Sequence, residues 1–307
     1  MMTPKIVLSP GQERALEKLR PLVELATSGI CKRLPFRPRT SALLIGPSGS
    51  GKSHLARELA RQSNMPFWEA NMGSWIVLGA RSETHTFESL ANWIFRHESG
   101  VIFLDELDKL SGSSGSDWLN FVRLEAHDLL DSRVPDGAVV PAGVSKLEEL
   151  AGFDSGELTQ SIMMADIQEK LRTSFFILGA GAWMGGWQEN RHQLGFNAPA
   201  SADRRIDRRQ ILQSISPELL QRFRRDIIYL DPMSKRDYQG VAASIMARLP
   251  KTLVDRFVRA CTPAIEMALE ECLGMRIFEE VLADVWSAEY AVHRNNKNAW
   301  TYLTRYP

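Results

Sequence analysis

Residues 46–53 read GPSGSGKS, and this stretch decides the fold. It follows the short apolar run ALLI at residues 42–45 and precedes LARELARQ at residues 55–62, whose leucines have helical spacing. Gly-x-x-x-x-Gly-Lys-Ser between a strand and a helix is the pattern of a phosphate-binding loop. Its glycines let successive backbone N–H groups point at phosphates, and the helix N-terminus adds positive partial charge. The stretch therefore predicts a nucleoside triphosphate site.

Each position of this loop has an expected task. Lys52 reaches the β- and γ-phosphates, and the Ser53 hydroxyl binds Mg²⁺. The residues expected to contact nucleotide are Gly46, Pro47, Ser48, Gly49, Ser50, Gly51, Lys52, Ser53 and His54. The ligands predicted here are ATP and Mg²⁺.

A second motif, VIFLDELDKL at residues 101–110, supplies acidic groups. The apolar run predicts a buried strand that delivers Asp105 to its carboxyl end, where the carboxylate holds Mg²⁺. Glu106 follows directly and is placed to polarise the attacking water. Two adjacent acids at the end of a buried strand require a nearby cation. Nucleotide binding without hydrolysis is the alternative, and the presence of Glu106 argues against it.

Apolar strands and amphipathic helices alternate along the first 232 residues. Strands are expected within residues 42–45, 65–72, 100–105, 174–183 and 226–231. Because these strands are continuously apolar, they predict an α/β fold with a doubly wound parallel sheet, buried on both faces. From Pro232 onward the pattern is helical only, with two amphipathic blocks at residues 254–274 and 275–295. The expected domains are a large α/β nucleotide-binding domain, 1–232, and a small all-helical domain, 233–307.

Composition narrows the class of protein. Lys and Arg together number 37, as do Asp and Glu, so no net field draws the chain toward nucleic acid or an anionic membrane. The N-terminus has no apolar leader, and no later run has the length of a membrane span. Three scattered cysteines fit a reducing compartment better than a disulfide framework. A cytoplasmic protein without membrane contact is expected.

Further motifs follow in order along the chain: FLDELDKL at 103–110, FFILGAGAW at 175–183, SPELLQRF at 216–223 and GMRIFEEVL at 274–282. With the phosphate loop they resemble the AAA+ ATPases, and in particular the Clp-type unfoldases of the ClpX and HslU kind. The resemblance covers most of the chain, although this sequence lacks the N-terminal zinc-binding adaptor domain. It implies an ATP hydrolase whose residues 233–307 form a lid.

The resemblance also assigns two arginines. Arg222 becomes an arginine finger offered to the nucleotide of a neighbouring subunit, and Arg276 becomes a lid arginine that contacts phosphates in its own subunit. For each the alternative is an ordinary surface ion pair. A finger acting on a neighbour implies a homo-oligomeric ring of six that remodels or unfolds protein substrates. A nucleic-acid-associated regulator or loader, and an ATP-switched assembly scaffold that threads nothing, remain alternatives.

Two departures from the unfoldase pattern stand out. The aromatic-aliphatic-glycine triplet that grips substrate is missing, because its place falls near Ala80-Arg81-Ser82. Trp75-Ile76-Val77 is either a displaced gripping loop or a segment that packs in the core. At the end of the fourth expected strand, Gly179-Ala180-Gly181 supplies no polar sensor residue.

The segment RHQLGFNAPA at residues 191–200 carries an apolar tripeptide in a polar surrounding. Leu194-Gly195-Phe196 has the form and position of the loop by which ClpX-like unfoldases dock on a ring peptidase; alternatively, it folds back on its own domain. A basic run follows, formed by Arg204, Arg205, Arg208 and Arg209, with Arg224 and Arg225 further along the chain. This run is a solvated or intersubunit face, or else it contacts nucleic-acid phosphates, a possibility weakened by the absence of interleaved aromatic residues.

Overall fold

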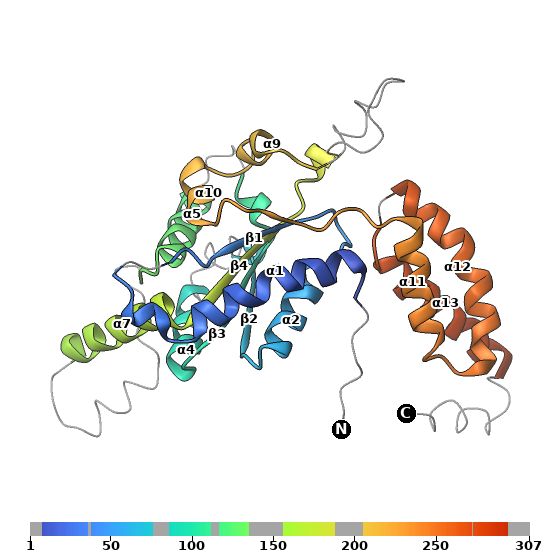
Figure 1. Cartoon of the computed structure of the whole chain (residues 1–307), viewed down its shortest axis with the longest axis horizontal. Helices are drawn as coiled ribbons and strands as arrows, with labels where there is room; N and C mark the ends of the chain where they lie inside the picture. Colours follow the sequence, from blue (N-terminus) through green and yellow to red (C-terminus); the bar gives the residue numbers. More distant parts are fainter. Residues whose placement is uncertain are drawn as a thin grey trace. The chain divides into compact units, whose positions relative to one another are not determined.

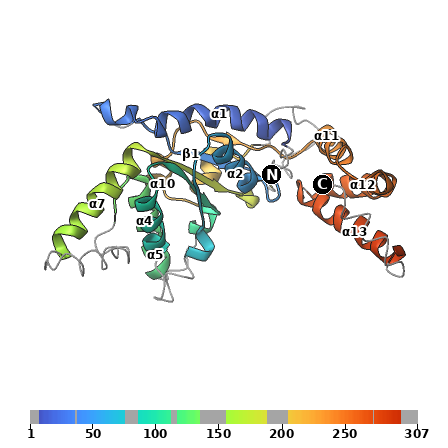
Figure 2. The same ribbon diagram turned by 90° about the horizontal axis from the view of Figure 1, so that it is seen from below.

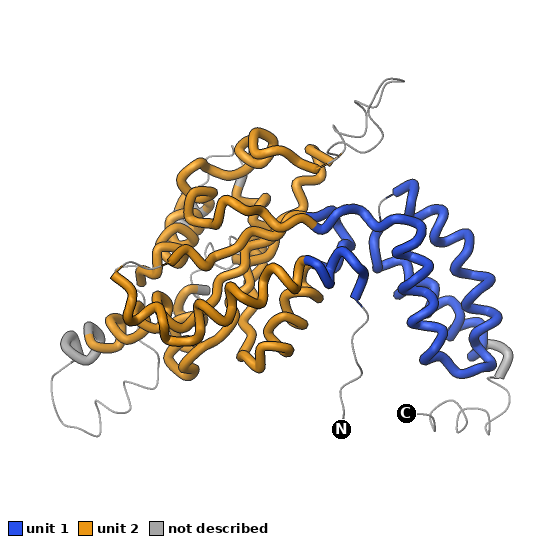
Figure 3. The backbone as a smooth tube through the Cα atoms, in the orientation of Figure 1, with its two compact units in different colours: residues 1–14, 46–51, 230–307 blue, residues 15–45, 52–229 orange. Residues whose placement is uncertain are grey.

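The computed structural model describes residues 8–35, 38–75, 86–111, 117–134, 156–187, 205–271 and 273–293. The chain divides into two compact units (Figure 3). One comprises residues 15–45 and 52–229, and the other comprises residues 1–14, 46–51 and 230–307.

The larger unit is built on a five-stranded sheet in the order β2-β3-β4-β1-β5 (Figure 1). Its strands are β1 (Ala42–Ile45), β2 (Phe67–Asn71), β3 (Gly100–Asp105), β4 (Phe175–Gly181) and β5 (Ile228–Tyr229). All neighbouring strands are parallel. The predicted α/β fold with a parallel sheet is therefore confirmed, and the carboxyl ends of β1, β3 and β4 lie at one edge.

Helices cover both faces of this sheet, as a doubly wound topology requires. They are α1 (Pro10–Thr27), α2 (Lys52–Gln62), α4 (Thr86–Arg96), α5 (Asp117–Leu130), α7 (Gly156–Thr173), α9 (Arg208–Leu212) and α10 (Pro217–Arg222), with single 3₁₀ turns at η1 (Ile30–Arg33) and η2 (Leu107–Ser111). In Figure 2, α1 and α2 lie on one side of the strands and α4 and α5 on the other.

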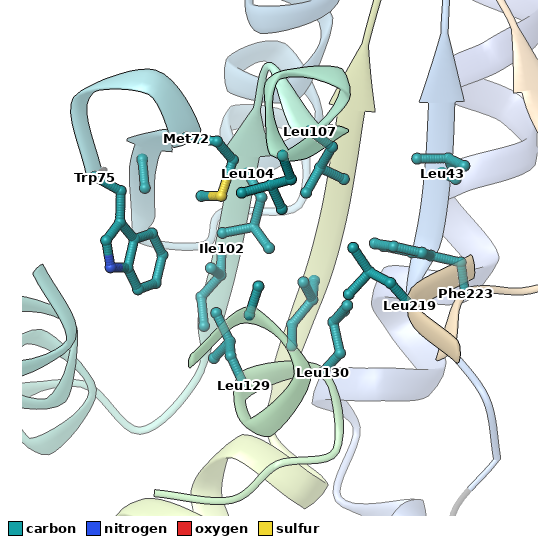
Figure 4. Close-up of a cluster of buried hydrophobic side chains, with 14 of the residues drawn as sticks. Leu43, Met72, Trp75, Ile102, Leu104, Leu107, Leu129, Leu130, Leu219 and Phe223 are labelled. Carbon is teal, nitrogen blue, oxygen red and sulfur yellow. The ribbon is translucent and has the colours of Figure 1, made fainter. Parts of the chain in front are cut away.

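The burial pattern explains why the strands read as apolar throughout. Every residue of β4 is buried, as are residues 100–104 of β3. Ile102 and Leu104 face a cluster that includes Leu129 of α5 and Leu219 of α10 (Figure 4). Because alternate side chains of a strand point to opposite faces, Val101 and Phe103 are buried on the other side. Packing on both faces therefore fixes the position of β3, and with it the place where the strand ends.

After residue 230, the described part of the second unit folds into the helices α11 (Lys235–Met246), α12 (Lys251–Glu271) and α13 (Arg276–His293). Tyr238, Phe257 and Phe278 pack in its own hydrophobic core. Ser234 caps α11, and its side chain and that of Asp237 form a reciprocal capping box. Gly274, with φ +66°, makes the turn between α12 and α13. The helical pattern predicted after residue 232 is present.

None of the helices within the described residues combines the length and the apolarity needed to cross a membrane.

Candidate functional site

The backbone of the phosphate loop requires glycine at specific positions. Gly49 and Gly51 have φ values of +76° and +81°, a left-handed conformation that only glycine adopts without penalty. A side chain on Gly46 would place its Cβ 2.9 Å from the Leu230 Cβ and carbonyl oxygen. The loop closes on itself where the Ser50 N–H donates to the Pro47 carbonyl at 3.2 Å. Three glycines of the motif are therefore set by local geometry.

Gln12 anchors this loop and was not anticipated from the sequence. Its buried side chain donates through Nε2 to the Ser50 carbonyl at 3.0 Å, while its Oε1 accepts from the Ser9 N–H at 2.8 Å. The signal in the sequence was the pattern Ser-Pro-Gly-Gln, which has the spacing of a capping box. Gln12 therefore helps to hold the loop in its curled shape.

One polar atom of the loop is buried without a partner. The Ser50 hydroxyl makes no hydrogen bond within the described part of the chain. Buried polar atoms are nearly always paired, so an unpaired hydroxyl within a loop of this shape fits an oxyanion ligand. The loop thus suits a nucleotide phosphate.

Ser53 and Asp105 meet where α2 begins and β3 ends. The Ser53 hydroxyl donates to Asp105 Oδ2 at 2.7 Å, and Asp105 Oδ1 accepts from the Glu106 N–H at 2.9 Å. A hydroxyl and a carboxylate are oxygen donors of the kind that Mg²⁺ binds, and Mg²⁺ uses few protein ligands. Lys52 is the first residue of α2, and His54 lies half-buried in the same turn. The structure therefore brings the two predicted magnesium ligands together.

Glu106 occupies an unusual backbone conformation. Its φ of +58° is left-handed, which costs a non-glycine residue energy and is concentrated at functional sites. A Cβ added to Gly73 would lie 3.4 Å from Glu106 Oε2 and 3.1 Å from Asn71 Oδ1. The carboxylate therefore lies beside the segment that follows β2, and the small Gly73 leaves room for it.

Asp108 is the acidic side chain that meets the end of β4. Its Oδ1 accepts from the Ala182 N–H at 3.2 Å, and its Oδ2 accepts from the Trp183 N–H at 3.4 Å. A Cβ on Gly181 would overlap the Trp183 ring and lie 2.8 Å from Asp108 Oδ1. The glycine is therefore required by packing, and the acidic side chain comes from η2 rather than from β4.

Arg222 is held within its own subunit. Its Nη2 donates to Asp131 Oδ2 at 2.7 Å and its Nη1 to the Glu218 carbonyl at 2.8 Å. The Arg222 Nε is buried and has no hydrogen-bond partner among the described residues. Burial lowers the pKa of the neighbouring His127, and the positive charge of Arg222 lowers this pKa further. In the single chain Arg222 thus forms the ion pair that was the alternative to a finger.

Arg276 contacts the phosphate loop directly. It is the exposed first residue of α13, and its Nη1 donates to the Ser48 hydroxyl at 3.4 Å. Next to it, the Met275 N–H donates to the Gly49 carbonyl at 2.9 Å. A Cβ on Gly274 would overlap this same carbonyl group. The buried Tyr238 hydroxyl accepts from the Gly274 N–H at 3.0 Å, so the turn is fixed from both sides.

The close approach of Gly274 to Gly49 predicts that alanine substitutions at two glycines will change the free energy of unfolding in opposite directions. Gly274→Ala should lower the free energy of unfolding by about 2 kcal/mol or more, because the new Cβ meets Gly49 and φ is positive. Gly240→Ala is the control: Gly240 lies inside α11 with nothing within 4 Å of an added Cβ. That change should stabilise the chain by about 0.5 to 1 kcal/mol. Denaturant titration of both variants checks this, and shifts of the same sign would contradict the contact.

Trp75 belongs to the buried hydrophobic cluster (Figure 4). Its side chain is 1% exposed, its Nε1 donates to Glu125 Oε2 at 2.7 Å, and its ring meets Trp68 edge to face. From the sequence, Trp75-Ile76-Val77 is either a displaced gripping loop or a segment that packs in the core, and in the structure Trp75 packs in the core. Ile76, Val77, Ala80-Arg81-Ser82 and Leu194-Gly195-Phe196 lie outside the described residues, as does Arg204.

Comparison with known proteins agrees with this architecture. Residues 42–133 match the family described as ATPase family associated with various cellular activities (AAA). The ATP-dependent Clp protease ATP-binding subunit ClpX 2 of Wolinella succinogenes is 28% identical over 80% of this chain and 64% of its own length. The ATP-dependent zinc metalloprotease FtsH of Thermus thermophilus is 32% identical over 34% of this chain and 17% of its own length. A probable 26S proteasome regulatory subunit 10B of Caenorhabditis elegans is 25% identical over 52% of this chain and 37% of its own length.

The chain thus spans less than two thirds of the length of each of these relatives. The family match begins at β1 and ends beyond α5, so it contains the phosphate loop, Asp105 and Glu106. The similarity to ClpX extends over most of the chain. The family match, the parallel sheet with this loop after β1 and the acidic pair after β3 identify residues 42–133 as an AAA ATPase domain, and the chain has Clp-type similarity.

Proposed function

We propose that this chain binds ATP at residues 46–53 and hydrolyses it to ADP and phosphate. The loop N–H groups and Lys52 bind the phosphates, and Arg276 reaches the same loop through Ser48. Ser53 and Asp105 would hold Mg²⁺, which neutralises charge on the phosphates. Glu106 accepts a proton from the attacking water.

The arrangement of Ser53, Asp105 and Glu106 is the observation that carries this proposal. The hydrogen bond between Ser53 and Asp105 joins the start of α2 to the end of β3. Glu106, the residue after Asp105, has a left-handed backbone conformation that sets the direction of its carboxylate. Release of phosphate from ATP by the purified chain tests the proposal. We expect turnover with Mg²⁺ and its loss on chelation with EDTA, regained when Mg²⁺ is restored. Turnover that survives chelation would contradict the assigned metal site.

We propose further that hydrolysis requires a ring of subunits, six in number, in which Arg222 acts on the nucleotide of its neighbour. Arg222 is one quarter exposed, and its ion pair with Asp131 is a partly solvated one of the kind that contributes at most about 1 kcal/mol. Such a pair is readily exchanged for a phosphate ligand.

Mixing two inactive variants tests this action between subunits. Arg222→Ala lacks the finger but keeps the base, whereas Glu106→Gln lacks the base but keeps the finger. An equal mixture should recover about a quarter of wild-type turnover, because one interface in four joins an intact base to an intact finger. Each variant assayed alone, at the same total concentration, is the control. Failure of every mixing ratio to restore phosphate release would count against a finger supplied by a neighbour.

The action we propose for this ring is the remodelling of protein substrates in a reducing, cytoplasmic compartment. Similarity to ClpX along most of the chain supports remodelling, and the free thiols of Cys31 and Cys261 are compatible with that compartment. A docked peptidase would contact Leu194-Gly195-Phe196. ATP-dependent loss of fluorescence from a tagged fluorescent protein measures unfolding directly.

An ATP-switched scaffold that threads nothing is the second candidate. The burial of Trp75 favours it, because the nearest aromatic residue to the gripping position lies in the core. In that case ATP would drive assembly, measured by light scattering, without any loss of substrate fluorescence.

A further inference from the structure

Three arginines from separate segments surround one cavity in the larger unit. Arg39 precedes β1, Arg208 opens α9, and Arg225 follows α10. The cavity has a volume of about 350 Å³, and Leu220, Gln221 and Phe223 complete its lining. Leu220 and Phe223 are 2% and 1% exposed, so the floor is part of the hydrophobic core. The sequence placed Arg208 and Arg225 in a basic run but gave no sign that Arg39 joins them.

The position of the cavity separates it from the phosphate loop. The Arg224 N–H donates to the Ser41 carbonyl at 2.9 Å, which ties the segment after α10 to the start of β1. Arg39 therefore lies at the amino end of β1, whereas residues 46–53 follow its carboxyl end. The cavity is a second site rather than an extension of the nucleotide site.

Among the described residues no carboxylate lines this cavity. Within the same part of the chain none of the three arginines, all of them exposed, forms an ion pair or a side-chain hydrogen bond. Elsewhere in the same unit Arg57, Arg61 and Arg222 each pair with a carboxylate. Three like charges converging on one cavity repel each other, so an anionic ligand would gain from all three.

The number of donors indicates which anion fits. A single guanidinium already satisfies one carboxylate through two parallel hydrogen bonds. Three guanidiniums match a phosphate group better, because it has more oxygens and more negative charge. The cavity is larger than a phosphate group and falls in the size range of pockets for small organic ligands. Its apolar floor and the Gln221 amide would contact the organic part.

We propose that Arg39, Arg208 and Arg225 form a second anion site that binds the phosphate group of a phosphorylated ligand. The ligand is either a free small phosphate compound or the backbone of a single-stranded nucleic acid. The site is independent of the proposed ATP hydrolysis.

The test uses the full chain with Lys52→Ala, which removes phosphate binding at residues 46–53. Inorganic pyrophosphate is titrated by calorimetry, and a single-stranded oligonucleotide by fluorescence anisotropy at several salt concentrations. The same titrations are repeated after Arg39→Gln, Arg208→Gln and Arg225→Gln, singly and together. The matched control replaces Arg96, Arg133 and Arg172 with glutamine, since all three are exposed and none lines the cavity. Circular dichroism confirms that each variant is folded.

Saturable pyrophosphate binding that each cavity substitution weakens about tenfold or more, with the control unchanged, is the result expected for a free ligand. For a nucleic-acid ligand we expect the triple variant to lower the slope of log affinity against log salt by about two. The proposal is overturned if neither probe binds, or if the cavity and control variants bind them equally. It is also overturned if the triple variant alters only self-association in sedimentation, because the cavity would then hold carboxylates of a second copy.

Discussion

Replacing Lys52 with alanine will reduce the affinity for ATP by about 100-fold, because the phosphates lose hydrogen bonds to a charged group. Lys52 is the first residue of α2 and directly follows the left-handed Gly51, so its side chain starts at the end of the phosphate loop. Isothermal titration with ATP and Mg²⁺ measures the change. The fold should be retained, since the substitution lies at an incompletely buried position.

The chain offers a closely matched control for this change. Lys235 is the first residue of α11 and is exposed, so Lys235→Ala removes the same charge from the same helical position. ATP affinity should be unchanged in that variant. If both lysine variants bound ATP as the wild type does, residues 46–53 would not be the nucleotide site.

Replacing Glu106 with glutamine will leave ATP binding intact and slow hydrolysis by about 10² to 10⁴, the usual contribution of a general base. Glutamine has the same shape as glutamate, so it can adopt the same backbone conformation beside Gly73. The Ser53 to Asp105 hydrogen bond and the loop are untouched by this change. Single-turnover phosphate release, compared with ATP affinity in the same preparation, separates the two effects.

Glu98→Gln is the control for charge, because Glu98 is 91% exposed and lies just before β3. Its turnover should equal that of the wild type. A Glu106→Gln variant that hydrolyses ATP at the wild-type rate would show that another group accepts the proton.

Local signals in the sequence were sufficient to predict the sheet and the centre of the site. The run VIFLD is apolar because β3 is buried on both faces, and the acids follow because the strand ends there. Ser216 predicted the start of α10, and its hydroxyl indeed accepts from the Leu219 N–H. These features depend on neighbours in sequence, so pattern alone was enough.

What the sequence did not reveal depends on residues that are distant along the chain. Nothing local to Trp75 shows that Glu125 will bind its indole N–H, and nothing near Gly181 shows that Asp108 will cap β4. Gln12 likewise reaches a loop 38 positions away. Such contacts arise only when the strands have been ordered, because parallel neighbours in the sheet are not neighbours in the chain.

The left-handed backbone at Glu106 sets stability against activity at a single position. Glycine would adopt the same conformation without strain and would relieve a cost on the order of 1 kcal/mol, but it would also remove the carboxylate. Any screen that rewards only resistance to heat will therefore favour losing the side chain at this point. ATP turnover should therefore be measured for any thermostable variant in which residue 106 has changed, since the most stable residue at this position gives an inactive enzyme.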